Sequence, residues 1–105
     1  MNIQSLSGKT LELEILLNEL NNNIDVICID EHWLNSNQIS SIHLHNYMIA
    51  NYFCRSQLIH GGTMIFVRDN IRIKPLNFVN YLNQDQIFES CAIQVTDSNI
   101  IIVSI

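Results

Sequence analysis

The chain is poor in the residues that break a fold or charge its surface. Its 105 residues include one proline, three glycines and only 14% charged side chains, whereas 48% are hydrophobic. That hydrophobic share is too large for a disordered chain. No apolar run comes near the roughly 20 residues that a membrane-spanning helix needs. We therefore expect one globular domain, with no membrane partner, because a chain of this length rarely supports a second core.

Cysteine and basic residues are also too few for several kinds of site. Cys28, Cys54 and Cys91 are an odd number and form no C-x-x-C pair, so they encode neither a disulfide framework nor a zinc ribbon. Five Lys and Arg against ten Asp and Glu give a net charge of -5, which weighs against tight nucleic-acid binding by this chain alone. Because polar residues follow Met1 where a signal peptide would be apolar, we expect an intracellular location, cytoplasm or nucleus, without secretion.

The apolar pattern predicts an α/β (α+β) fold. Leu13, Leu16, Leu17 and Leu20 recur at helical spacing and predict one main helix over residues 8–23. Continuous or alternating apolar stretches predict strands at 25–30, 47–53, 63–68, 86–96 and 100–105. We expect a mixed β-sheet of about five strands, with the helix packed on one face and residues 26–29 central, and an irregular segment near 75–84.

Glu31 stands directly after the predicted strand 25–30. The carboxyl end of a strand is where open α/β sheets place their ligand sites. A carboxylate there can hold Mg²⁺ or Mn²⁺, which typically take one or two carboxylates together with water and phosphate oxygens. On position alone, a solvated acid in a loop beside Asp30 remains the alternative.

Three motifs occur in the order found in one family. The first, Asn2-Ile3-Gln4-Ser5-Leu6, places an Asn before a Ser-Leu step. The second, Ile27-Cys28-Ile29-Asp30-Glu31-His32-Trp33-Leu34, is an apolar strand that ends in Glu, followed by Trp-Leu. The third, Gly61-Gly62-Thr63-Met64-Ile65-Phe66-Val67-Arg68, is a strand that opens with two glycines. Together they resemble the endonuclease/exonuclease/phosphatase family, in the branch carried by non-LTR retrotransposons. The resemblance implies a partial domain over residues 1–105, truncated at both ends and amounting to roughly half of a four-layer α/β sandwich.

The resemblance also implies a function. It makes the chain a fragment of a divalent-metal-dependent endonuclease that hydrolyses phosphodiesters of DNA, in which Glu31 binds Mg²⁺ or Mn²⁺ and Asn2 belongs to the catalytic set. The family's catalytic Asp with its companion Asn, and its late Asp-His pair, have no counterpart here. We therefore expect the chain alone to bind metal and DNA weakly and to be inactive, with the missing half of the domain as a partner.

Other readings stay open. A non-catalytic α/β module could bind a protein partner through an uncovered sheet face, and a phosphatase or exonuclease branch of the family is a third possibility. The pair His43 and His45 lacks a third ligand nearby in sequence, so we expect no metal there. Glu89 shares a predicted strand face with apolar residues, and the pattern does not decide whether it points inward. The remaining candidates are read as surface or capping residues: His32, His60, Arg68, Arg72 and Lys74.

Overall fold

The computed structural model describes residues 1–57 and 60–105, which form one helix, six strands and three short 3-10 helices. The α-helix α1 spans Thr10–Glu19. The strands are β1 (Val26–Asp30), β2 (Tyr47–Phe53), β3 (Thr63–Arg68), β4 (Ile73–Pro75), β5 (Cys91–Val95) and β6 (Ile101–Ser104). The 3-10 helices are η1 (Leu6–Gly8), η2 (Ile39–Ser41) and η3 (Asn77–Leu82). Among the described residues, none of the helices combines the length and the apolar character that crossing a bilayer requires.

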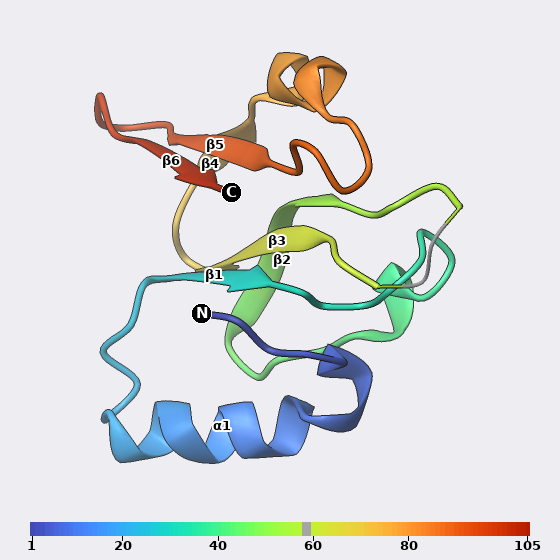
Figure 1. The fold of residues 1–105 in the computed structure, drawn as a ribbon. Coiled ribbons are helices and arrows are strands. Elements are labelled where there is room, and N and C mark those ends of the chain that lie inside the picture. The colour runs from blue at the N-terminus through green and yellow to red at the C-terminus, as the bar shows by residue number, and fades with distance from the viewer. Residues whose placement is uncertain (58–59) are drawn as a thin grey trace.

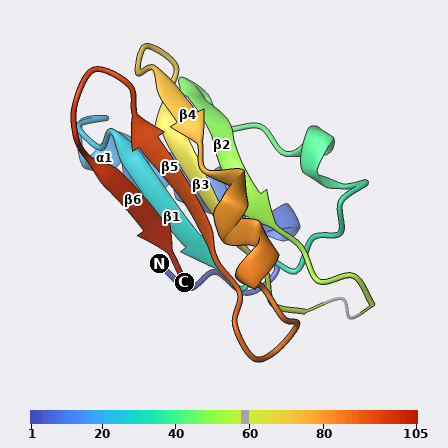
Figure 2. The ribbon, with the colours of Figure 1, turned by 90° about the horizontal axis from the view of Figure 1, so that it is seen from above.

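The elements stack in three layers (Figures 1 and 2). The helix α1 lies under one antiparallel sheet of order β1-β3-β2, called sheet A here, and a second antiparallel sheet of order β4-β5-β6, sheet B, lies on its other face. The α+β fold class with one main helix is thus confirmed. The single mixed sheet that we expected is instead two sheets of three strands each.

Alternation along the strands of sheet A explains this stacking. Ile27, Ile29 and Phe66 face α1, where they pack with Leu13 and Leu17. The intervening side chains face sheet B, where Ile65 and Val67 join Cys91 and Ile93 in a second core. A strand between two layers is covered on both faces, and this is why residues 26–29 and 64–67 form continuous apolar runs in the sequence.

One parallel contact occurs beside the antiparallel strand pairs, at the outer edge of β1. The segment around Asn2 forms a parallel bridge with Asp30, in which the Asp30 amide donates to the Met1 carbonyl at 2.8 Å and the Ile3 amide donates to the Asp30 carbonyl at 2.9 Å. The central strand of sheet A is nevertheless β3, not β1. The strand β3 is buried from Thr63 to Val67 and has a full strand on each side.

Three predicted boundaries differ from the structure. The helix is shorter than 8–23, because Gly8 ends η1 and Lys9 is the non-helical cap of α1, and because Asn21 and Asn22 adopt left-handed backbone angles at its end. The predicted strand 86–96 is a strand only over Cys91–Val95, since the residues before it form a turn around the Glu89 carboxylate. The segment near 75–84 contains the 3-10 helix η3, and the short strand β4 was not predicted.

Candidate functional site

The loop after β1 is fastened to the two glycines before β3. The Glu31 amide donates to the Gly62 carbonyl at 2.8 Å, and the Trp33 amide donates to the Gly61 carbonyl at 3.0 Å. Both glycines have left-handed backbone angles, φ 79° and 86°, which glycine adopts without steric penalty. Two of the three sequence motifs are therefore joined by backbone hydrogen bonds, and these place Glu31 at the end of β1.

His32 fills the space between these segments. Its side chain is fully buried, Nε2 donates to the Phe53 carbonyl at 2.8 Å and Nδ1 accepts the Leu34 amide at 2.9 Å. One nitrogen donates while the other accepts, so the ring is neutral. Burial lowers the pKa of His32, although the Phe53 carbonyl and nearby acids oppose that shift. A Cβ at Gly62 would overlap the imidazole ring, so this position has room only for glycine.

The Glu31 side chain is oriented by a neighbour in its own loop. Trp33 Nε1 donates to Glu31 Oε2 at 2.9 Å, and the indole stacks on His60 with ring centroids 4.1 Å apart. Glu31 and Trp33 both adopt positive φ, 61° and 60°, which is unusual for residues with a side chain. Strained backbone of this kind is concentrated at functional sites.

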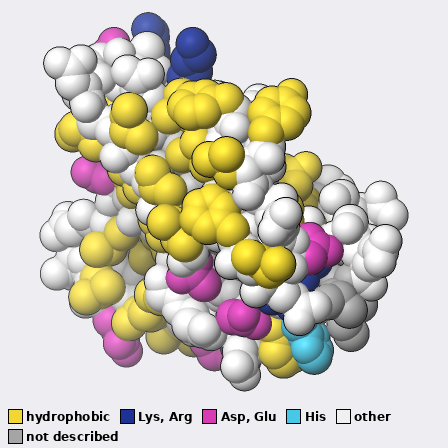
Figure 3. Space-filling view, turned by 45° about the horizontal axis from the view of Figure 1, so that its top comes forward, with side chains coloured by type: hydrophobic (Ala, Val, Ile, Leu, Met, Phe, Trp, Pro, Cys, Tyr) yellow, Lys and Arg dark blue, Asp and Glu magenta, His cyan; other side chains and the backbone are white. Residues whose placement is uncertain are grey.

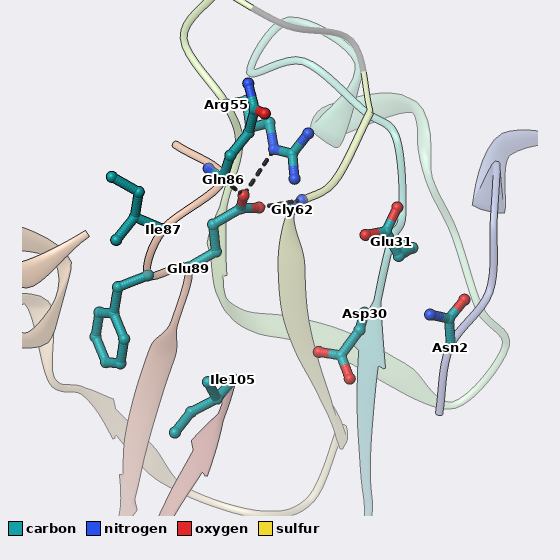
Figure 4. Close-up of a pocket in the computed structure, with 10 residues that line it drawn as sticks. Asn2, Asp30, Glu31, Arg55, Gly62, Gln86, Ile87, Glu89 and Ile105 are labelled. Carbon is teal, nitrogen blue, oxygen red and sulfur yellow. Dashed lines mark hydrogen bonds and ion pairs between the residues drawn. The ribbon is translucent and has the colours of Figure 1, made fainter. Parts of the chain in front are cut away.

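Glu31 and Asn2 line the same cavity, of about 360 Å³, between the ends of the two sheets (Figure 4). The structure thus brings together the two residues that the family resemblance selected. Asp30 lines the cavity as well, and its Oδ1 accepts the Thr63 hydroxyl at 3.0 Å and the Ser104 hydroxyl at 3.2 Å. The complete lining is Asn2, Asp30, Glu31, Arg55, Gly62, Gln86, Ile87, Phe88, Glu89 and Ile105.

An ion pair forms the opposite wall of the cavity (Figure 4). Arg55 Nε donates to Glu89 Oε2 at 2.7 Å, and the carboxylate also accepts the backbone amides of Gly62 and Gln86, each at 2.8 Å. Burial acts to raise the pKa of Glu89, but the two amides and Arg55 together outweigh it, so the pKa is lowered. Glu89 is therefore ionised and fixed, and it attaches the turn before β5 to the loop before β3.

The donor set fits a hard divalent cation only in part. Asp30 and Glu31 supply carboxylates and Asn2 an amide oxygen, which suits Mg²⁺ or Mn²⁺ with the remaining positions taken by water or phosphate. Within residues 1–57 and 60–105, no group of three or more His, Cys, Asp and Glu side chains could hold a metal ion. Burial raises the pKa of Cys54 to about 11 and that of Cys91 to about 12, so both thiols are protonated at neutral pH.

Other residues considered from the sequence lie apart from the cavity. Arg68 is engaged by the turn after α1, where it contacts the Asp25 carboxylate at 3.2 Å and the Ile24 carbonyl at 3.0 Å. His43 and His45 are exposed. Sequence reasoning missed Asp30 and Arg55 as lining residues and left Glu89 undecided. No local pattern marks Arg55, since only the fold brings it to Glu89.

Comparisons with known proteins leave the family assignment untested. No family model matches the chain, and no curated protein and no solved structure shows significant similarity to it. Any functional assignment must therefore depend on the motifs and on the geometry of the cavity.

Gly62→Ala should destabilise the protein by about 2–4 kcal/mol, because an alanine at φ 86° is strained and its Cβ overlaps His32. Gly8→Ala is the matched control, since nothing lies within 4 Å of its added Cβ, and it should change stability by less than about 1 kcal/mol. Urea unfolding measures both. Equal stability of the two variants would show that the His32 and Gly62 contact is absent.

Acidification should destabilise the protein through His32. The unfolded chain binds this proton near pH 6.5 and the folded chain only at lower pH, so the free energy of unfolding should fall as pH drops from 7 to 5, by up to about 1.4 kcal/mol per pH unit. The lowered pKa of Glu89 acts below its ordinary value of 4.5, outside this window. In His32→Gln the slope should flatten, whereas the exposed control His43→Gln should keep it. An unchanged slope in His32→Gln contradicts the assignment.

Proposed function

We propose that the chain provides part of the active site of a divalent-metal phosphodiesterase that acts on DNA, as in the retrotransposon branch of the endonuclease/exonuclease/phosphatase family. One observation supports this most strongly. Asn2 and Glu31 come from separate motifs, far apart in sequence, and line one cavity at the carboxyl end of β1. A buried core needs no such meeting of polar side chains, whereas a metal site does.

The proposed roles follow from the contacts of each side chain. Glu31 presents a carboxylate whose Oε2 is oriented by the Trp33 indole, and Asp30 stands beside it with Oδ1 held by two hydroxyls. Bound Mg²⁺ or Mn²⁺ would neutralise phosphate charge and lower the pKa of a bound water. Arg55 uses Nε for Glu89, and its guanidinium is the one cationic side chain among the described residues that line the cavity, where it can meet a phosphate oxygen.

The site is incomplete in this proposal. Cleavage of a phosphodiester needs a positioned base for the attacking water and stabilisation of the leaving oxygen in addition to the metal. The residues that perform those tasks in the family have no counterpart in residues 1–105. The chain alone should therefore be inactive, and its proposed partner is the remaining half of the sandwich, in the cytoplasm or nucleus.

The outer side of sheet B is the surface proposed for that partner. Here this surface means the outward side chains of residues 101–105, which include β6, with those of η3, and Figure 3 shows hydrophobic side chains gathered there. Its members are 48–89% exposed: Phe78, Tyr81, Leu82, Ile101, Val103 and Ile105. A contiguous apolar patch of this kind usually marks an interface.

The same surface, together with the open edge of β6 beside it, supports a second candidate function, a non-catalytic module that binds a protein partner. The strand β6 is at the edge of sheet B and contains neither charge nor proline, so its backbone can accept a further strand. The occupant in this case is an extended apolar strand of another protein. This function needs no metal, and metal binding therefore separates the two candidates.

Metal binding tests the leading proposal. Mn²⁺ titrated into the protein should selectively broaden the NMR amide signals of Asn2, Asp30 and Glu31, with weak affinity because the cavity supplies few ligands. Glu31→Gln should abolish the effect, whereas Glu12→Gln, on an exposed position of α1, should not. The same protein with Mg²⁺ or Mn²⁺ should not nick supercoiled plasmid above background.

Two results would oppose the proposal in different ways. Broadening that spreads over all surface acids, or that persists in Glu31→Gln, would remove the metal site and leave the protein-binding module. Efficient nicking that disappears in Glu31→Gln would show that the chain holds a complete catalytic set.

A further inference from the structure

A second cavity, of about 370 Å³, is lined in part by Trp33, two residues after Glu31. Its lining is Ser5, Trp33, Asn35, Gln38 and His60. The two cavities are linked through Trp33, because its indole lines the second cavity while its Nε1 hydrogen bonds to Glu31, which lines the first. A molecule bound in one cavity is therefore close to whatever occupies the other.

Aromatic rings form one side of this second cavity. Trp33 and His60 are stacked, with an interplanar angle of 26° and centroids 4.1 Å apart. His60 is exposed and Trp33 is only half-buried, so the stacked pair is open to solvent. Packing inside the core does not explain such a pair. Aromatic side chains at the surface are platforms on which unstacked nucleobases lie, because every base has a π-face.

Two amide side chains that also line the cavity, Asn35 and Gln38, already use their oxygens as acceptors of backbone hydrogen bonds. Asn35 Oδ1 accepts the amides of Asn37 at 3.0 Å and Gln38 at 3.1 Å, and Gln38 Oε1 accepts the Asn35 amide at 3.0 Å. These bonds fix both side chains and leave their NH₂ groups as oriented donors. Oriented NH₂ groups match the ring nitrogens and carbonyl oxygens on the edge of a base.

The charge of the lining residues indicates whether a cavity suits a base or a phosphate. Among the residues that the structure describes, no Lys, Arg, Asp or Glu lines the second cavity, whereas Asp30, Glu31, Arg55 and Glu89 all line the first. Phosphate recognition draws on cations, and a neutral aromatic ring does not. The second cavity thus suits an uncharged heterocycle.

We propose that the second cavity is a nucleobase subsite, in which an unstacked base lies against the Trp33 and His60 pair and accepts hydrogen bonds from Asn35 and Gln38. This inference rests on the proposed function in one respect, that the base belongs to a strand whose phosphate lies in the first cavity. Base binding itself needs no metal and can be tested separately.

Trp33 is the protein's one tryptophan, so its fluorescence reports on this cavity and on the Glu31 carboxylate to which it is bonded, and an abasic oligonucleotide separates the two. Titration with a short single-stranded DNA oligonucleotide in EDTA should quench it in a saturable manner. His60→Ala should weaken binding about tenfold, the effect typical of losing one base–aromatic stack. The exposed His43→Ala, outside the cavity, should bind as the wild type does. Asn35→Asp keeps the acceptor oxygen of the turn but removes the donor, and it should also weaken binding.

Further probes distinguish the source of the base and the chemistry of binding. Saturable quenching by a nucleoside monophosphate that matches the oligonucleotide supports a free nucleotide as the ligand, and tighter binding of the oligonucleotide supports a strand. No quenching by either, or equal quenching by an abasic oligonucleotide, overturns the subsite. Because these titrations contain EDTA, they can fail while the Mn²⁺ site at Glu31 stands, and the reverse also holds.

Discussion

The candidate site depends on how the Glu31 loop docks on the two glycines before β3. Two backbone hydrogen bonds join Glu31 and Trp33 to Gly62 and Gly61, and the buried His32 occupies the space that a side chain at Gly62 would need. Without this contact, Glu31 would be a solvated acid at the end of a strand. With it, the carboxylate is held at a defined place, next to Asp30 and the segment that carries Asn2.

Layer packing provides the rigid base for that contact. The strand β3 is buried between α1 and sheet B, and it aligns both β1 and β2. The start of β3 therefore determines where Gly61 and Gly62 meet the loop that follows β1. Glu89, in the turn before β5, connects sheet B to this region, since its carboxylate accepts hydrogen bonds from the Gly62 amide and from Arg55. Both sheets thus contribute to one cavity, although the motifs that suggested a site come only from sheet A and its loops.

Much of the fold could be predicted from apolar patterning. Strands at 47–53 and 63–68 were placed correctly. In β3, burial on both faces makes the run from Met64 to Val67 continuously apolar. The division into two sheets could not be predicted, since pairing depends on which apolar face meets which. Residues 86–90 looked like a strand because Ile87 and Phe88 are apolar, but Ile87 is 79% exposed and Glu89 holds the segment in a turn.

Only the site residues that belong to a sequence motif could be predicted. Asn2 and Glu31 were selected by resemblance, and the geometry brings them together. Arg55 and Glu89 come from segments far apart, and nothing local to either residue indicates that they pair across the cavity.

Hydrogen exchange at two amides tests the central contact most directly. The Glu31 and Trp33 amides lie in a loop, but each is bonded to a glycine carbonyl, so they should exchange as slowly as the amides of β1 itself. Exchange at the rate of unstructured loop amides would show that the Glu31 loop is not docked on Gly61 and Gly62, and the account of the site would then be wrong.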